Sequence, residues 1–114
     1  MYTISLTPDM QASALVLGCM RLTELSGSEL DLHLKTALEL GINFFDHADI
    51  YGGYGGCERH FGEWLRANPH LRSQMLIQSK CGIVQNEEDQ NVSFDFSYGH
   101  ILKSVENSLR YLGI

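Results

Sequence analysis

The segment GINFFDHADIYG, residues 41–52, carries signals from which the rest of the chain can be interpreted. Gly41 ends a helical pattern in the manner of a residue just past a helix C-terminus. The run from Ile42 to Phe45 predicts a short buried strand, which leads directly into Asp46. A buried strand that ends in a charge is costly unless that charge has a partner. We therefore expect Asp46 to lie beside a cation from another strand.

Upstream of this segment, the sequence predicts one helix and two short strands. Ser28 and Asp31 have the spacing of a capping box at a helix N-terminus, and leucines then recur at helical spacing as far as Leu38. Residues 15–17 predict a buried strand that Gly18 ends. Residues 2–6 predict another strand, and these two strands could pair as a small hairpin or belong to separate layers.

Downstream, the pattern continues with helix, strand and helix. Residues 58–67 predict a helix, and residues 75–77 predict a strand that runs into Lys80. The polar, acidic stretch 82–97 predicts a long loop without regular structure. A last helix follows Ser97. Its predicted buried face consists of Ile101, Val105, Leu109 and Leu112, and Gly113 ends it.

The order of these elements predicts the fold class. Strands alternate with helices, which indicates α/β architecture with right-handed βαβ units and a parallel sheet. The strands are short and apolar without clean alternation, as expected of a sheet covered on both faces. A doubly wound sheet and a (β/α)8 barrel both fit the pattern. In both folds, functional groups lie at the carboxyl ends of the strands.

Composition excludes several classes of protein. The 114 residues, 44% apolar and 19% charged, suit one small globular domain, and the net charge of −6 gives no basic footprint for nucleic acid or an anionic membrane. No apolar run approaches the ~18 residues of a spanning helix. The first ten residues lack a signal-peptide pattern. Cys19, Cys57 and Cys81 show no CxxC spacing, so we interpret them as free thiols in a reducing cytoplasm.

Asp46, Tyr51 and Lys80 stand at or just after predicted strand ends and form a chemically sensible trio. A tyrosine phenol has a pKa near ~10 and gives up its proton reluctantly at neutral pH. A lysine ammonium about 4 Å away contributes about 4 kcal/mol at an effective dielectric of about 20, which could lower that pKa by up to ~3 pH units. An aspartate would keep the lysine charged and aimed. Tyr51 would then serve as general acid toward a carbonyl oxygen, with hydride supplied by a cofactor.

Two other interpretations of these residues stay open. Asp46 and Lys80 could form a purely structural ion pair, with Tyr51 only a loop aromatic. A metal site could use carboxylates and imidazoles, although the adjacent Asp46 and His47 point to opposite sides of a strand. The residues of that metal site would be Asp46, His47, Asp49 and His60.

The glycines at 52–56 could mark a phosphate-binding loop. The G-x-G-x-x-G pattern counted from Gly53 places Glu58 where the last glycine belongs, and an acid at a helix start repels phosphate. We therefore interpret the glycines as a flexible turn. Cys81, beside the cation of Lys80, could be a reactive thiolate. No base partner is evident, which favours a small packed residue.

The combined motifs resemble those of the aldo-keto reductase superfamily. Residues 41–52 resemble its signature, in which a strand ends in aspartate and a tyrosine follows five residues later. Residues 78–82, QSKCG, resemble the third strand, which ends in the catalytic lysine. Residues 17–21, LGCMR, resemble the loop that lies against the nicotinamide ribose. The spacing between these pieces also matches, so the resemblance covers nearly the whole chain and is closest to bacterial members of the DHADIYGGY type.

The resemblance implies that residues 1–114 form one incomplete domain, the N-terminal part of a (β/α)8 TIM barrel with about three β/α units. The first two predicted strands could add a short N-terminal hairpin to it. It implies reduction of an aldehyde or ketone to an alcohol with NADPH, in which Tyr51 donates the proton while Lys80 and Asp46 tune it. The expected partner is a small-molecule carbonyl substrate, without nucleic acid or membrane. The residues implied to contact the nicotinamide half of NADPH are Gly18, Cys19, Met20 and Asp46.

The chain also departs from the family pattern. The family's catalytic histidine and its cofactor-phosphate residues would lie beyond residue 114, so we expect this chain alone to be inactive. Uncovered strand edges and apolar faces predict that it self-associates or is poorly soluble. An NADPH-binding regulatory or redox-sensing subunit with little turnover, or a gene remnant without function, remain alternatives. The sequence does not identify the substrate.

Overall fold

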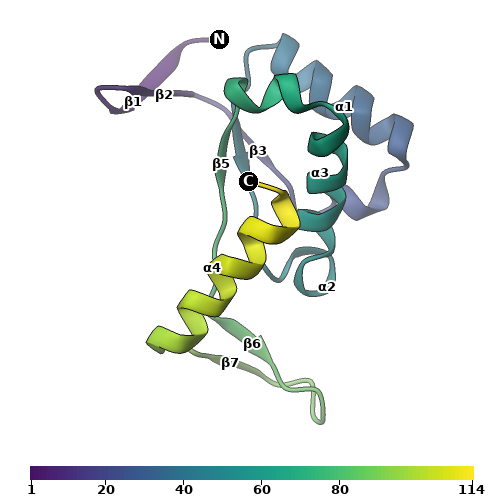
Figure 1. The fold of residues 1–114 in the computed structure, drawn as a ribbon, viewed down its shortest axis with the longest axis vertical. Coiled ribbons are helices and arrows are strands. Elements are labelled where there is room, and N and C mark those ends of the chain that lie inside the picture. Colours follow the sequence, from purple (N-terminus) through teal and green to yellow (C-terminus); the bar gives the residue numbers. More distant parts are fainter.

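A computed structural model describes all residues from Met1 to Ile114 (Figure 1). The strands are β1 (Thr3–Thr7), β2 (Met10–Ser13), β3 (Val16–Gly18), β4 (Phe44–Asp46), β5 (Leu76–Gln78), β6 (Ile83–Gln85) and β7 (Val92–Phe94). The α-helices are α1 (Gly27–Glu39), α2 (Tyr51–Tyr54), α3 (Gly56–Ala67) and α4 (Tyr98–Leu112). Two short 3-10 helices span Leu22–Glu24 and Pro69–Gln74.

The central feature is a parallel sheet of β3, β4 and β5, with β4 in the middle. Phe45 of β4 pairs with Leu17 on one side and with Ile77 on the other. This arrangement confirms the predicted βαβ units and the parallel sheet. No further strand pairs with the outer edges of β3 and β5, so the sheet is open and not closed into a barrel.

Two antiparallel hairpins flank the sheet. An N-terminal hairpin is present, but it pairs β1 with β2, a strand that the sequence analysis missed. The strand at residues 16–18 belongs to the parallel sheet, so the two predicted strands lie in separate sheets, which was one of the two alternatives. The stretch 82–97, expected to be a structureless loop, instead contains the hairpin β6–β7, in which Val84 pairs with Ser93. Short alternating segments such as Val92–Phe94 carry a strand signal too weak to stand out in a polar, acidic stretch.

The N-terminus of α1 begins earlier than predicted. Ser26, not Ser28, is the capping residue: its side chain accepts a hydrogen bond from the Glu29 backbone N–H at 3.4 Å. The Glu29 carboxylate in turn accepts from the Ser26 backbone N–H at 2.8 Å. The predicted box of Ser28 and Asp31 is wrong because Ser28 already lies inside the helix. Asp31 instead accepts hydrogen bonds from side chains nearby.

Replacing Ser26 by alanine should therefore lower the free energy of unfolding by about 1 kcal/mol, because it leaves a backbone N–H of the first turn without its acceptor. The matched change Ser28→Ala should have almost no effect, since alanine is the better helix former inside α1. Urea denaturation of both variants measures the difference. Equal losses in the two variants would contradict the assignment of the cap.

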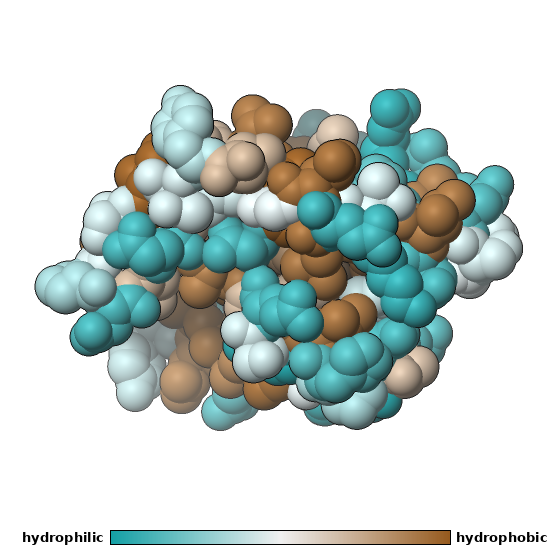
Figure 2. Space-filling model, turned by 90° about the horizontal axis from the view of Figure 1, so that it is seen from above, coloured by the Kyte–Doolittle hydropathy of each residue, from teal (hydrophilic) through white to brown (hydrophobic).

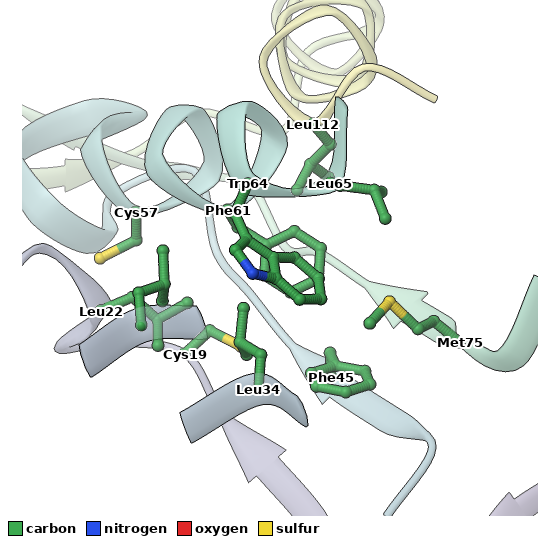
Figure 3. Close-up of a cluster of buried hydrophobic side chains, with 11 residues drawn as sticks. Cys19, Leu22, Leu34, Phe45, Cys57, Phe61, Trp64, Leu65, Met75 and Leu112 are labelled. Atoms are coloured by element: carbon green, nitrogen blue, oxygen red, sulfur yellow. The ribbon is translucent and has the colours of Figure 1, made fainter. Parts of the chain in front are cut away.

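The hydrophobic core lies between the sheet and the helices α1 and α3 (Figure 3). Phe45 from β4 meets Phe61 of α3 with ring centroids 5.7 Å apart, and Trp64 lies one turn further along the helix at 5.8 Å from Phe61. Phe61 and Trp64 thus pack α3 against the sheet. The remaining core members are Cys19, Leu22, Leu30, Leu34, Cys57, Leu65, Met75 and Leu112. The core holds one face of the sheet against α3, and this packing fixes the positions of the carboxyl ends of the strands.

Helix α4 packs on α3 with a different face from the one predicted. Its buried residues are Ser104, Ser108 and Leu112, whereas Val105 and Leu109 are 48% and 46% exposed. The predicted buried face is therefore wrong for Ile101, Val105 and Leu109, which are exposed, and right for Leu112. The helices approach so closely that a Cβ added at Gly62 would lie 2.0 Å from the Tyr111 backbone oxygen. Small serines fit such a contact and larger aliphatic side chains do not.

Apolar side chains reach the surface between polar ones, as the brown areas among teal in Figure 2 show. The exposed apolar side chains of the molecule include Ile101, Val105 and Leu109 of α4. The expectation of uncovered strand edges and uncovered apolar faces is confirmed. No helix of the chain combines the length and the apolar character needed to cross a bilayer.

Candidate active site at the carboxyl ends of the strands

The carboxyl ends of the three parallel strands meet along one row. Gly18 of β3 pairs with Asp46 of β4, which pairs with Gln78 of β5. The pairing continues beyond the strands, because the His47 backbone N–H donates to the Gln78 carbonyl oxygen at 2.8 Å. Lys80 follows on the chain and its carbonyl oxygen accepts from the Asp49 N–H at 3.0 Å. The backbone thus brings Asp46 and Lys80 to the same end of the sheet, where the carboxyl ends of the strands lie.

Asp46 and Lys80 form the expected ion pair. The Lys80 Nζ donates to Asp46 Oδ1 at 2.7 Å and to the His47 carbonyl oxygen at 2.7 Å. Burial alone would raise the pKa of Asp46, but the hydrogen bonds from Lys80 and Gln78 outweigh it and hold that pKa below its usual value. Burial alone would lower the pKa of Lys80, but the hydrogen bond to Asp46 and the nearby Tyr51 phenol raise it above its usual value. Each group therefore keeps the other ionised near neutral pH.

Tyr51 completes the trio. It opens α2, and the Lys80 Nζ lies 5.1 Å from the centroid of its ring. The ring is half-buried and packs against the hydrophobic core. Gly52 follows with φ of 70°, and a Cβ there would lie 2.7 Å from the Cys57 backbone nitrogen, so only glycine suits this turn. The structure thus brings Asp46, Tyr51 and Lys80 together.

Gln78 is a member of the site that the sequence analysis missed. Its side-chain amide donates to Asp46 Oδ1 at 2.5 Å, the same oxygen that Lys80 binds. Successive side chains of a strand alternate between faces, so Gln78 and Lys80, two residues apart, share one face. That spacing was the available signal, because any strand that places Lys80 beside Asp46 also places Gln78 there.

Three of the four predicted cofactor residues lie at the end of β3, and the fourth, Asp46, ends β4. Gly18 is exposed, and nothing lies within 4 Å of where its Cβ would be. Met20 is 59% exposed beside it. The Cys19 thiol is fully buried in the core (Figure 3), and burial together with the nearby Asp46 charge raises its pKa to about 12. In this arrangement Cys19 has no side-chain atom available to a ligand, while Gly18 and Met20 border open space.

His47 points away from the site, to the helix side of the sheet. Its ring is fully buried and meets Phe61 edge-on, with centroids 4.7 Å apart. Neither ring nitrogen has a hydrogen-bond partner. Burial lowers the pKa of His47 from its ordinary 6.5 to about 4, against the opposing charge of Asp46. The imidazole is therefore neutral at physiological pH.

This burial predicts an acid-sensitive fold. The unfolded chain takes up a proton on His47 near pH 6.5 and the folded chain only near pH 4, so stability is complete above pH 6.5 and falls as the pH drops toward 4. The gap corresponds to about 3 kcal/mol. Asp46, whose folded pKa is lowered, loses its contribution only at still lower pH. Urea denaturation at several pH values between 7 and 4 measures the slope.

The variant His47→Leu should remove most of that pH dependence, because leucine fills the pocket without titrating. His70 is exposed, so His70→Asn is the matched control and should leave the slope unchanged. A wild-type chain whose stability is flat across this range would show that His47 is not held neutral.

The metal alternative receives no geometric support. Asp46 faces Lys80 while His47 faces Phe61, and His60 hydrogen-bonds through Nε2 to the Leu25 carbonyl oxygen at 3.1 Å. No cluster of three histidine, cysteine, aspartate or glutamate side chains is placed to hold a metal ion. Of the remaining candidates, Cys81 is half-buried and lines a hollow of about 220 Å³ between Lys80 and the exposed apolar face of α4.

The chain resembles a known family of proteins. The model of the "Aldo/keto reductase family" matches residues 14–114. Oxidoreductase YdhF of Escherichia coli (strain K12) is 45% identical over an alignment of 101 residues that covers 85% of this chain and 34% of that protein. The uncharacterized oxidoreductase YcsN of Bacillus subtilis (strain 168) is 40% identical over an alignment of 118 residues, gaps included, that covers 98% of this chain and 39% of that one. The chain thus spans between a third and two fifths of the length of these relatives.

Solved structures of aldo-keto reductases share the fold of this chain. The aldo-keto reductase AKR11C1 from Bacillus halodurans, in a holo form, superimposes with a TM-score of 0.80 at 31% identity, covering 99% of this chain and 37% of that chain. The putative aldo-keto reductase PA4992 from Pseudomonas aeruginosa also gives 0.80, at 32% identity and with 97% and 42% coverage. The parallel sheet therefore corresponds to the first β/α units of a (β/α)8 barrel and not to a doubly wound sheet.

Proposed function

Because this chain belongs to the aldo/keto reductase family of oxidoreductases, we propose that it provides the proton-donating part of an NADPH-dependent carbonyl reductase. The intact protein would reduce an aldehyde or a ketone to an alcohol. The observation that carries the proposal is the convergence of Asp46, Lys80 and Tyr51 at the carboxyl ends of the parallel strands. This is the end at which barrel enzymes place their chemistry.

Each side chain of the trio would have its own role in the proton transfer. Tyr51 would donate its phenolic proton to the carbonyl oxygen as negative charge develops there. The Lys80 ammonium beside the ring favours the phenolate that remains, because opposite charges attract strongly at short range in a partly dry site. Asp46, held by Gln78 as well as by Lys80, keeps the ammonium charged and directed. The trio thus returns to its starting state when Tyr51 regains a proton.

The residues at the strand ends fit a nicotinamide cofactor. When bound, NADPH would supply the hydride, which no side chain can provide. Gly18 and Met20 border open space at the end of β3, and Asp46 is 28% exposed toward the same edge. Because glycine has no side chain, a planar ring can approach its backbone closely. Cys19 would contribute through its backbone, since its thiol is buried. One relative, from Schizosaccharomyces pombe, is named aldo-keto reductase yakc [NADP(+)].

A chimera tests the proposal. Residues 1–114 replace the segment of Escherichia coli YdhF that they match, and the purified chimera is assayed for NADPH oxidation with reactive aldehydes and ketones. We expect carbonyl-dependent oxidation of NADPH. A chimera that melts cooperatively and binds NADPH but turns nothing over would instead favour a regulatory, cofactor-binding role. A folded chimera that neither binds NADPH nor reduces carbonyls would overturn both.

The 114-residue chain alone is expected to lack turnover and to self-associate. The unpaired edges of β3 and β5 and the exposed apolar residues of α4 support this, because such surfaces pair with other chains in water. Light scattering on the isolated chain would reveal assemblies larger than a monomer. A stable, active monomer would contradict the expectation.

A further inference from the structure

A buried acid on α3 contacts the residue next to Lys80. Glu58 lies in the first turn of α3, is 0% exposed and accepts a hydrogen bond through Oε1 from Ser79 Oγ at 2.6 Å. This carboxylate lies outside the trio, and its Oε2 has no partner. A buried carboxylate is costly. The hydrogen bond from Ser79 therefore offsets part of the cost of burying Glu58 and ties the two residues together.

The geometry of residues 78–80 shows what this bond does. Gln78 and Lys80 both reach Asp46 on one face of the sheet, whereas Ser79 between them points to the opposite face and meets Glu58. β5 is an edge strand, so this segment receives backbone hydrogen bonds only from the β4 side. The Ser79–Glu58 bond is its side-chain attachment to the helix layer.

We propose that Glu58 is a positioning residue for the carbonyl reductase site, and that it acts through Ser79 to hold the Lys80 ammonium against Asp46 and Tyr51. The consequence for catalysis rests on the proposed function. The consequence for the Lys80 side chain does not, since it follows from the contacts alone.

The surroundings of Glu58 leave few substitutes for this contact. Asp49 lies near, and its pKa is raised by burial and by the charge of Glu58. No hydrogen bond joins Asp49 to Glu58, and the Ser79 hydroxyl is the donor identified for the Glu58 side chain. Removing the Ser79 hydroxyl would leave both oxygens buried without a partner, which favours movement of the segment that carries Lys80. Displacing a catalytic group by about 1 Å can cost about a hundredfold in rate.

The first experiment observes Lys80 directly in the chimera with YdhF, because the isolated 114-residue chain is expected to self-associate. Lysine labelled with ¹³C and ¹⁵N is titrated by NMR in the parent and in Ser79→Ala. We expect the Lys80 pKa to fall toward the ordinary lysine value in Ser79→Ala, because its contacts with Asp46 and Tyr51 loosen. It should stay at the parent value in Ser79→Thr, which restores the hydroxyl, and in Glu58→Gln, whose side-chain oxygen can still accept. The exposed Ser73→Ala is the control.

The second experiment measures rates in the chimera with YdhF. Ser79→Ala should lower kcat about tenfold to a hundredfold while the KM for NADPH changes little. In a Lys80→Met background, Ser79→Ala should cause no further loss, because the side chain that it positions is gone. A merely structural role would lower the rate by the same factor in both backgrounds.

The two experiments separate the possible failures. If the Lys80 pKa is the same in the parent and in Ser79→Ala, or if the losses from Ser79→Ala and Lys80→Met multiply, the positioning role is overturned. If the Lys80 pKa responds as expected but the parent chimera has no activity, the positioning of Lys80 stands and the proposed reductase function fails.

Discussion

Replacing Tyr51 by phenylalanine is expected to lower kcat of the chimera by about 10²- to 10⁴-fold, because that is the range over which a positioned acid accelerates proton transfer. Phenylalanine keeps the ring that packs against the core and lies beside Lys80. The fold and the affinity for NADPH should therefore change little. Steady-state rates, together with NADPH binding measured by fluorescence, separate the loss of the proton donor from loss of structure.

Tyr54 offers the matched control. It lies in the same short helix as Tyr51, and its hydroxyl donates to the Ile83 carbonyl oxygen at 3.2 Å, away from Lys80. Tyr54→Phe should leave kcat close to the parent value. If Tyr51→Phe retains full activity, Tyr51 is not the proton donor, and the structural interpretation of the Asp46–Lys80 pair would be favoured.

Replacing Phe61 by alanine is expected to cost about 3–5 kcal/mol of folding free energy, the usual range for removing a buried aromatic ring. Phe61 is fully buried and contacts Phe45, His47 and Trp64, so it joins the sheet to α3. A domain with a total stability of 5–15 kcal/mol would lose a large share of it. Urea denaturation followed by tryptophan fluorescence measures the loss, since Trp64 packs against the altered site.

Phe94→Ala is the control for ring removal. Phe94 is 68% exposed on the hairpin β6–β7 and stacks only on Phe96 there. Its removal should change the free energy of unfolding by well under 1 kcal/mol, as for most surface substitutions. Similar losses in the two variants would mean that Phe61 does not organise the core.

Much of the site could be predicted from the sequence because short stretches of neighbouring residues specify it. An apolar run that ends in Asp46, and another that leads into Lys80, place both charges at strand ends. Parallel strands bring those ends to one edge, so the ion pair follows from strand order alone. Gln78 could have been predicted by the same alternation. Glu58 could not, because nothing in the spacing of residues 58 and 79 says that a helix start will cover that position.

The amino-acid sequence by itself determined the alternation of three parallel strands with helices and the trio of Asp46, Tyr51 and Lys80, since these depend on periodicity and on right-handed connections that neighbouring residues specify. Only the tertiary structure decided which face of α4 is buried, where the acidic stretch 82–97 pairs with itself, and what holds Ser79. The physical reason is that burial depends on what packs opposite. The backbone of α4 approaches α3 at Gly62, which admits serines and turns the apolar face outward.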